Sequence, residues 1–227
     1  MRIGIVGASE NEINPFISVM SNTQTEEYAM LTFHKGKYAG IDIIALFCGV
    51  CKVNAAIATQ ILIDKYQVAQ IIVVGVAGAI DTELHIGDTI ISSEIAYHDV
   101  ADEILTQYHP WMKSIYFTAA ENIVHGIIKA NADDHSVMVG RIVTGEAFID
   151  QEGRKEIIEK YNPLCVDMET ASIAHVCYVN SIPIAAIRSM SDTPHESGNS
   201  AFERYGKAAA EKSVRVLIRY LNQIAAR

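Results

Sequence analysis

Hydrophobic positions along the chain fall into short continuous runs that alternate with amphipathic stretches. Residues 2–8 and 70–79 are almost entirely apolar, as expected of strands that are covered on both faces in a parallel sheet. Residues 200–225 instead place apolar side chains on one side of a helix, and residues 53–62 form a helical stretch rich in small and apolar residues. Because such strands alternate with helices, we predict a single α/β domain over residues 1–227 with a largely parallel sheet.

The same patterns predict the remaining elements. We expect strands at 28–35, 41–48, 87–93, 136–144 and 183–187, and helices at 118–130 and 151–161 and after residue 170. Three helices are predicted to begin at capping boxes, in which a serine or threonine precedes a glutamate by three positions; these boxes open at Ser9, Thr118 and Ser200. Residues 100–118 are the least patterned and are interpreted as a lid or an interface segment.

Composition and charge exclude several classes of protein. Half of the 227 residues are hydrophobic, which is enough for a sizeable core. The formal net charge of −9 argues against a general nucleic-acid binder. No signal peptide or membrane span is recognisable, so no membrane partner is expected. The four cysteines lie in apolar surroundings, and we therefore expect reduced thiols and a cytoplasmic location.

The short motifs of the chain give weak signals for cofactors. The glycines near the N-terminus do not complete a dinucleotide fingerprint, and no phosphate loop of the GK[ST] type is present. Cys48 and Cys51 have the spacing of a metal or redox pair, but a zinc site needs two such pairs or added histidines. The neighbours His98 and Asp99 have no nucleophile near them in sequence and are interpreted as a loop feature. We therefore expect neither a metal nor a cofactor.

Charged residues gather where two predicted strands end. Asp167 and Glu169 lie where an apolar strand passes into a helix, and Arg188 and Asp192 follow the apolar strand 183–187. In an open α/β sheet this edge is where ligands bind. Two carboxylates, an arginine and a glycine-lined strand end are compatible with acid–base chemistry on a small polar molecule. A purely structural ion pair between Arg188 and Asp192 stays open as the alternative.

Five motifs of the chain resemble those of a known family. In order they are Gly7-Ala8-Ser9-Glu10-Asn11-Glu12, Gly75-Val76-Ala77-Gly78, Gly145-Glu146-Ala147-Phe148-Ile149, Val166-Asp167-Met168-Glu169 and Arg188-Ser189-Met190-Ser191-Asp192. Together they are similar to the 5'-methylthioadenosine/S-adenosylhomocysteine nucleosidases of the nucleoside phosphorylase superfamily, from Met1 to the last helix. The resemblance implies a twisted, mixed, mostly parallel sheet surrounded by helices, and a homodimer. It also implies irreversible hydrolysis of an N-glycosidic bond, releasing adenine and a 5-thioribose.

The resemblance further implies roles for individual residues. Asp192 would be the general acid at N7 of adenine, which requires a raised pKa. Glu12 would be the base that activates the attacking water, and Arg188 would orient the water and the carboxylates. Glu169 would hold the ribose hydroxyls beside the Met168 backbone, which favours an oxocarbenium-like transition state.

A substrate pocket is implied around these groups. Phe148 would stack on adenine, the Ile149 backbone would read the edge of the base, and Phe202 would pack near the sugar and the 5' group. The other residues implied to contact substrate are Ser9, Val76, Ala77, Gly78, Asp167 and Ser191. Plainer alternatives stay open: Glu12 as a helix-capping partner, Phe148 as ordinary core and Phe202 as a packing residue at the start of a helix.

Two positions depart from the family pattern. The family usually has methionine where this chain has Ser9, and serine or threonine where it has Val76, whose side chain cannot hydrogen-bond to the attacking water. Residues 100–118, which would complete the 5' pocket across the dimer, also match poorly. The expected partner is a small-molecule nucleoside, with aminofutalosine or another purine nucleoside as the alternative substrate. A phosphorylase, which Glu12 argues against, and a non-catalytic nucleoside-binding module are the other hypotheses.

Overall fold

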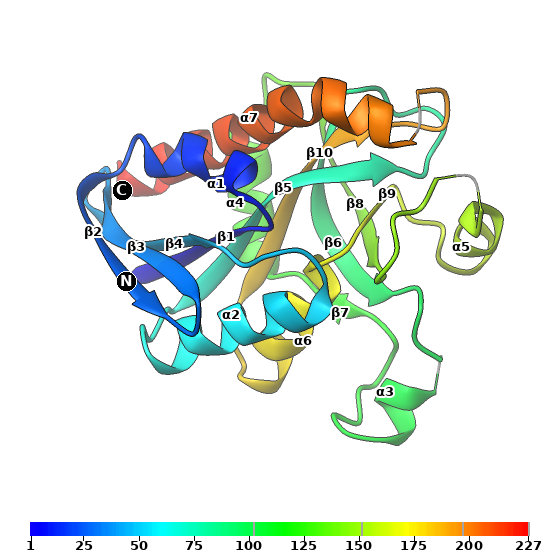
Figure 1. The fold of residues 1–227 in the computed structure, drawn as a ribbon, viewed down its shortest axis with the longest axis horizontal. Helices are drawn as coiled ribbons and strands as arrows, with labels where there is room; N and C mark the ends of the chain where they lie inside the picture. The colour runs from blue at the N-terminus through cyan, green and yellow to red at the C-terminus, as the bar shows by residue number, and fades with distance from the viewer. Residues whose placement is uncertain (102, 151, 197, 227) are drawn as a thin grey trace.

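The chain folds around one mixed β-sheet with helices on both faces (Figure 1). A computed structural model describes residues 1–101, 103–150, 152–196 and 198–226. The central strands lie parallel and side by side in the order β4 (Ile41–Phe47), β1 (Arg2–Gly7), β5 (Gln70–Ala79) and β10 (Ile184–Asp192). These strands carry the apolar runs of the sequence, because both of their faces are covered.

On one side the sheet closes on itself. β10 pairs antiparallel with β6 (Thr89–Tyr97), and pairing then continues through β8 (Val137–Thr144) and β9 (Cys165–Asp167) back to β5. The short strand β7 (Phe117–Thr118) pairs with β6. Closing strands into a ring requires strong twist and tilt. The expected α/β fold, with a twisted mixed sheet surrounded by helices, is confirmed, and parallel pairing dominates at its centre.

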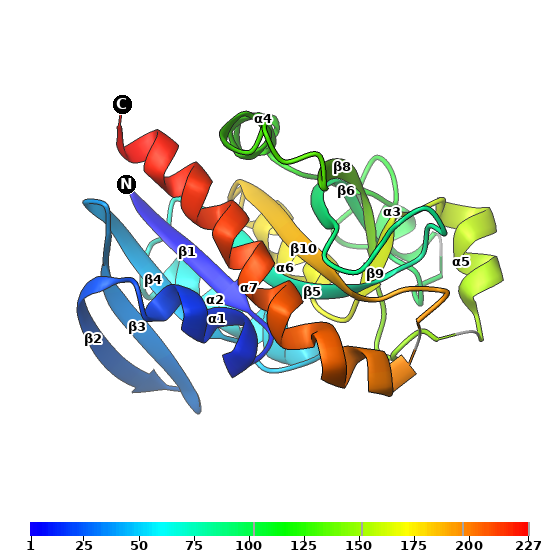
Figure 2. The same ribbon diagram turned by 90° about the horizontal axis from the view of Figure 1, so that it is seen from above.

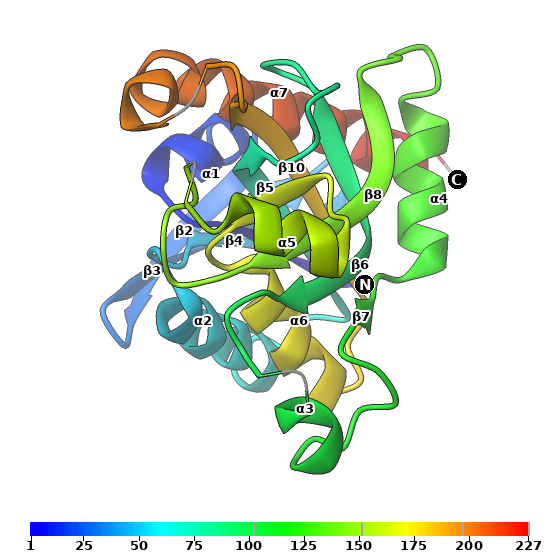
Figure 3. The ribbon, with the colours of Figure 1, turned by 90° about the vertical axis from the view of Figure 1, so that its right-hand side faces the viewer.

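The helices form two layers, one on each face of the sheet (Figures 1 and 2). One face is covered by α1 (Glu10–Ile17), α4 (Glu121–Ala130) and α7 (Gly198–Ala225), and the other by α2 (Lys52–Asp64) and α6 (Thr170–Val179). The helix α5 (Arg154–Tyr161) packs beside β8 and β9, and the short α3 (Ile104–Gln107) lies below β7 (Figure 3).

Alternation along the strands sorts their side chains between the two layers. Ile3 and Ile5 of β1 pack in the cluster that contains Leu217 of α7. Val6 packs in the opposite cluster with Leu62 of α2. The helices are therefore held by apolar burial on both faces, and the strand ends that carry polar residues remain at the edge of this core.

Several predicted boundaries were wrong in the N-terminal part. The strand β2 (Ser21–Tyr28) was missed, because its side chains are polar and it lies at the free edge of the sheet, paired with β3 (Leu31–Tyr38). A hairpin turn after Tyr28 therefore joins β2 to β3, which begins at Leu31 rather than at residue 28, and a second hairpin turn at Ala39 and Gly40 joins β3 to β4. Strand β6 also runs to Tyr97, beyond its predicted end at residue 93.

Other corrections concern helix starts and the last strand. Helix α4 begins at Glu121 with Ala120 as its N-cap, so Thr118 does not open a capping box. Helix α7 begins at Gly198, before Ser200. Gln151, where a helix was expected to start, lies outside the described residues. The last strand β10 continues to Asp192.

Candidate active site

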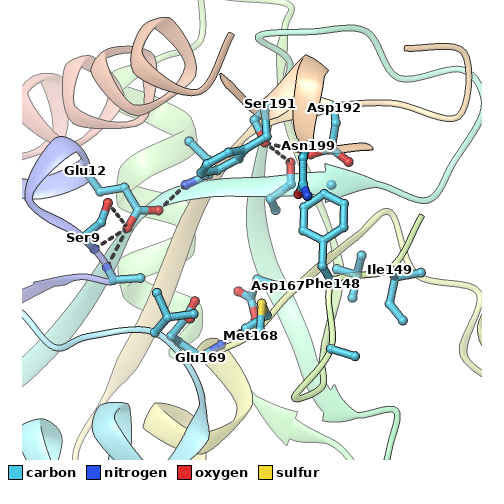
Figure 4. A pocket seen from close by; sticks show the side chains of 18 residues that line it. Ser9, Glu12, Phe148, Ile149, Asp167, Met168, Glu169, Ser191, Asp192 and Asn199 are labelled. Atoms are coloured by element: carbon cyan, nitrogen blue, oxygen red, sulfur yellow. Dashed lines mark hydrogen bonds between the residues drawn. The ribbon is translucent and has the colours of Figure 1, made fainter. Parts of the chain in front are cut away.

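A pocket opens at the carboxyl ends of β1, β5, β9 and β10, the edge at which ligands bind in α/β sheets (Figure 4). Its lining comes from segments far apart in sequence: Ala8, Ser9, Glu12, Val50, Val76, Ala77, Gly78, Ala147, Phe148, Ile149, Val166, Asp167, Met168, Glu169, Ser191, Asp192, Asn199 and Phe202. The fold thus gathers residues from these four strand ends, from the segment after β8 and from the first turns of α1 and α7 around one cavity.

Glu12 is fixed by backbone donors from two elements. Its Oε2 accepts hydrogen bonds from the N–H groups of Ala8 at 2.7 Å and Ser9 at 2.8 Å, and Oε1 accepts one from the Val76 N–H at 2.8 Å. Glu12 therefore does cap helix α1, as the plainer alternative held, and it also lines the pocket. Gly75 makes this possible, because any side chain there would overlap the Glu12 carboxylate.

Arg188 lies behind the pocket rather than in its wall. Its side chain is fully buried, and its Nε donates to Asp167 Oδ2 at 2.8 Å. Nη2 donates to Glu169 Oε2 at 3.3 Å, and Nη1 lies 3.5 Å from Glu12 Oε1. Burial alone would lower the pKa of Arg188, but the three carboxylates raise it overall. The guanidinium thus orients carboxylates, and it is not among the residues that line the cavity.

Asp167 serves this arrangement as a structural anchor. Its Oδ1 accepts hydrogen bonds from the Thr144 hydroxyl at 2.6 Å and from the Thr170 N–H at 3.1 Å, and its Oδ2 is bonded to Arg188 and the Thr170 hydroxyl. Although Asp167 reaches the pocket wall, both of its oxygens are occupied by the protein. Its position supports Arg188 more directly than it offers a substrate contact.

Glu169 lines the cavity, and its pKa is raised. Burial raises its pKa to about 7, although the Arg188 guanidinium opposes the rise. Its Oε1 accepts a hydrogen bond from the Cys51 N–H at 3.0 Å. Cys51 precedes α2 with a left-handed backbone, φ of 79°, which aims this N–H at the carboxylate. A group with such a pKa changes charge near neutral pH.

Asp192 differs from the other carboxylates in having few partners. Its Oδ1 accepts a hydrogen bond from the Ser191 hydroxyl at 2.9 Å, whereas Oδ2 is buried and has no hydrogen-bond partner among the described residues. Burial raises the pKa of Asp192, and the Ser191 bond offsets part of that rise. The carboxylate packs against Gly78, where a Cβ would lie 2.8 Å from Oδ2. An acid in this setting favours its protonated form.

A register irregularity in β10 brings Asp192 into the pocket. Successive residues of a regular strand point to opposite faces, yet Ser191 and Asp192 both line the cavity. The pairing of β10 with β5 shifts between Met190 and Asp192. Such irregularities re-aim side chains and occur often beside active sites.

Aromatic side chains border the opening of the cavity. Phe148 is 42 % exposed, so the alternative that it belongs to the core is wrong. Phe202 is 44 % exposed and lies in the first turns of α7. Exposed aromatic faces beside buried polar groups are typical of sites that bind a flat, partly polar ligand.

The expected site residues are nearly all brought together by the fold. Those that line the pocket are Ser9, Glu12, Val76, Ala77, Gly78, Phe148, Ile149, Asp167, Met168, Glu169, Ser191, Asp192 and Phe202. Arg188 is the exception, and its contacts are with Glu12, Asp167 and Glu169 rather than a structural pair with Asp192.

Sequence reasoning missed other parts of the site. The lining residues Ala8, Val50, Ala147 and Asn199 were not singled out. Ala8 and Ala147 lie inside two of the five motifs, so the site residues next to them in sequence could have indicated that they line the pocket. Nothing in the sequence marks Val50 or Asn199, because they reach the pocket through the arrangement of distant loops.

No helix in the described part of the chain is long and apolar enough to cross a membrane. Among the same residues, no group of histidine, cysteine, aspartate and glutamate side chains could hold a metal ion. All four cysteines have free thiols.

Comparison with known proteins was made with sequence and with structure. A model of the phosphorylase superfamily matches residues 2–222. A 5'-methylthioadenosine/S-adenosylhomocysteine nucleosidase of Maridesulfovibrio salexigens is 34 % identical over 234 residues, covering 99 % of this chain and 100 % of that protein. Both chains are thus matched over nearly their whole length.

Solved structures also match this chain over nearly its whole length. A Colwellia psychrerythraea nucleosidase of that name, in complex with adenine, has a TM-score of 0.89 and 32 % identity, covering 98 % of this chain and 95 % of that one. The futalosine hydrolase of Helicobacter pylori also has a TM-score of 0.89, with 25 % identity and 98 % of both chains covered. The chain belongs to the 5'-methylthioadenosine/S-adenosylhomocysteine nucleosidases of the phosphorylase superfamily and is a purine nucleosidase, an N-glycosyl hydrolase.

Proposed function

We propose that this enzyme hydrolyses the N-glycosidic bond of 5'-methylthioadenosine and S-adenosylhomocysteine, giving adenine and a 5-thioribose. The observation that carries the proposal is the pair of unlike carboxylates in one pocket. Asp192 has a buried oxygen that no described residue hydrogen-bonds, and Glu12 is held by backbone N–H donors. Relatives matched over nearly the whole chain have this activity in their names.

Asp192 is proposed as the general acid. The bond between C1' of the ribose and N9 of adenine breaks more easily when the base leaves as a neutral molecule, which requires a proton at N7. A raised pKa, caused chiefly by burial, favours the protonated form of Asp192 in the free enzyme. The unpartnered Oδ2 is available to donate it.

Glu12 is proposed as the base for the attacking water. Water adds to C1' as the C1'–N9 bond breaks, and its proton passes to Glu12 while Asp192 gives its own to adenine. Three backbone N–H groups donate to the Glu12 carboxylate and the Arg188 guanidinium lies nearby, so these contacts fix the oxygens that would accept the proton. Exchange with solvent then restores both carboxyl groups.

The ribose is proposed to bind at Glu169 beside the Met168 backbone. The carboxylate of Glu169 would accept hydrogen bonds from the sugar hydroxyls, and Arg188 and the Cys51 N–H hold it for that purpose. Fixing the sugar ring favours an oxocarbenium-like transition state. Adenine would stack on Phe148 with its edge against the Ile149 backbone, and Phe202 would lie near the 5' group.

The test is adenine release from four nucleosides in the absence of phosphate. We expect release from 5'-methylthioadenosine and S-adenosylhomocysteine, and slower release from adenosine and aminofutalosine. Binding without turnover of any of the four would contradict the proposal and favour a nucleoside-binding module. A strict requirement for phosphate would contradict the role of Glu12, because an anionic base repels phosphate.

A second substrate, aminofutalosine, is favoured by one feature of the pocket. Val76 lines the cavity without a hydroxyl, and a futalosine hydrolase is among the similar structures. A nucleosidase for this substrate would keep Glu12 and Asp192 and would differ in the 5' pocket. Release of adenine from aminofutalosine at a higher kcat/KM than from the thio-nucleosides would establish this alternative.

We propose that two copies associate through the face formed by α2 and α6. Helix α2 exposes Val53 at 69 % and Ile57 at 46 %, and α6 exposes Tyr178 at 46 %. The two helices lie side by side (Figures 1 and 3). Exposed apolar side chains on two neighbouring helices are typical of an interaction surface. Light scattering should give the mass of a dimer, and Val53→Glu should convert it to a monomer.

We also propose a cytoplasmic location. The four free thiols fit a reducing compartment, since a chain with several cysteines would be expected to form disulfides in an oxidising one. Fractionation of the native host should recover the chain with cytoplasmic markers.

A further inference from the structure

The segment 145–150 carries Phe148 into the pocket, with Ile149 packed against an apolar cluster at its end. Its residues 146–148 are exposed, so apolar burial does little to fix their conformation. The Glu146 N–H donates a hydrogen bond to Asp99 Oδ2 at 2.9 Å. Asp99 belongs to the His–Asp pair that the catalytic roles leave unused.

Lys52, the first residue of α2, holds Asp99 in place. Its Nζ donates to Asp99 Oδ1 at 2.9 Å and to Oδ2 at 2.8 Å. Its backbone N–H donates to Glu146 Oε1 at 3.1 Å. The side chains of Lys52 and Asp99 are only 21 % and 28 % exposed, so this ion pair is partly shielded from solvent. Lys52 therefore contacts the segment both directly and through Asp99.

The same turn of α2 reaches the sugar side of the pocket. The Cys51 N–H donates to Glu169 Oε1 at 3.0 Å, and the Ser172 hydroxyl donates to the Lys52 carbonyl at 2.8 Å. The start of α2 thus contacts both Glu169, which is proposed to bind the ribose, and segment 145–150, which is proposed to bind adenine. A displacement of segment 145–150 would therefore shift the contacts of Glu169, and a displacement of Glu169 would shift those of the segment.

We propose that Lys52 and Asp99 are positioning residues for the nucleosidase reaction. With Glu146 they form a latch, the Lys52–Asp99–Glu146 latch, which keeps segment 145–150 in the conformation that binds adenine. This inference rests on the proposed adenine site at Phe148. When a binding segment is competent for only a fraction of the time, the apparent affinity falls by that fraction. The latch therefore acts on affinity and leaves the chemical step of the bound complex unchanged.

The test is calorimetric binding of adenine to the native enzyme, to Lys52→Met, to Asp99→Asn and to the double variant. Each single change should raise the Kd for adenine about tenfold, and the double variant should show no further loss, because one change already opens the latch. KM for the nucleoside should rise by a similar factor while kcat stays within about twofold. Lys52→Arg, which keeps the charge, should retain most of the affinity.

A matched control separates positioning from stability. Lys212 and Asp134 form an ion pair whose side chains are 19 % and 23 % exposed, and neither lines the pocket. Lys212→Met should lower the midpoint of thermal unfolding about as much as Lys52→Met, with the Kd for adenine unchanged.

The outcomes distinguish the latch from the proposed function. Native enzyme that binds adenine, with Lys52→Met and Asp99→Asn binding equally well, would overturn the latch alone. Variants that lose affinity only in proportion to a loss of folded protein, as Lys212→Met then would too, would also overturn it. Native enzyme that binds no adenine would instead overturn the proposed adenine site, and the latch with it.

Discussion

Two carboxylates of the same pocket, Glu12 and Asp192, lie in opposite surroundings. Glu12 accepts three backbone N–H bonds and has the Arg188 guanidinium 3.5 Å away. Within the part of the chain that the structure describes, Asp192 accepts a hydrogen bond from the Ser191 hydroxyl, and its other oxygen is buried without a partner. Donors aimed at a carboxylate favour its charged form, and burial without donors favours its neutral form.

The comparison shows how one kind of side chain is given two roles. A base must be ionised before the reaction and an acid must be protonated, so their pKa values have to be separated by their environments. In this enzyme backbone N–H donors at the ends of β1 and β5 hold Glu12, whereas burial at the irregular end of β10 raises the pKa of Asp192. Replacing Asp192 and replacing Glu12 should therefore affect the reaction rate and the free energy of unfolding to different degrees.

The largest effect is expected at the acid. Asp192→Asn should lower kcat by about 10³–10⁴-fold, because adenine would leave without its proton. The free energy of unfolding should not fall, since the change removes a buried carboxyl oxygen that has no partner. Steady-state adenine release together with thermal unfolding checks both expectations. A variant that keeps a tenth of the native kcat would rule out Asp192 as the acid.

Glu12→Gln should have a smaller effect on rate and a larger one on stability. An oxocarbenium-like transition state needs less help from the base than from the acid, so we expect kcat to fall about 10²–10³-fold. The glutamine NH₂ group would face backbone N–H donors, and the free energy of unfolding should fall by about 1–3 kcal/mol. Chemical denaturation measures this loss, and Asp192→Asn is the matched comparison.

The pH dependence should report on Glu169. Its pKa is about 7, and ribose binding needs the charged form, so kcat/KM should fall about tenfold per unit as pH drops below 7. The folded pKa lies above the ordinary value of 4.5, so the native state binds this proton more tightly. The free energy of unfolding should thus rise as pH falls from 7 towards 4.5. Glu169→Gln should abolish both dependences, and pH profiles that it leaves unchanged would assign them elsewhere.

The smallest effect is expected at Val76. Its backbone N–H, rather than its side chain, holds Glu12, and a serine keeps that N–H. Val76→Ser should therefore change kcat/KM for 5'-methylthioadenosine by about threefold or less. A gain of tenfold or more would show that a hydroxyl at this position is needed to hold the water, and that the native site prefers another nucleoside.

The fold was predictable where the apolar pattern was strong. The central strands β1, β5 and β10 carry uninterrupted apolar runs, and they were recognised. Strand β2 could not be recognised, because its residues are polar and mostly exposed. It is held by backbone pairing with β3 at the sheet edge. The pattern of apolar and polar side chains does not predict a strand whose side chains are not buried.

The site was predictable as a set of side chains but not as a geometry. The motifs singled out Glu12, Glu169 and Asp192, all of which line the pocket. The backbone N–H groups of Cys51 and Val76, which hold two of these carboxylates, carry no side-chain signal. The shift in β10 that turns Asp192 inwards is a feature of strand pairing, and no local pattern marks it.

The most direct test of the account is the acidity of Asp192 itself. An NMR titration of ¹³C-labelled aspartate carboxyl groups, with native enzyme and Asp192→Asn compared, identifies its signal as the one lost in the variant. We predict that this carboxyl titrates well above the ordinary aspartate value of 3.8. A midpoint at or below 3.8 would mean that Asp192 is ionised at neutral pH and would contradict its role as the proton donor to adenine.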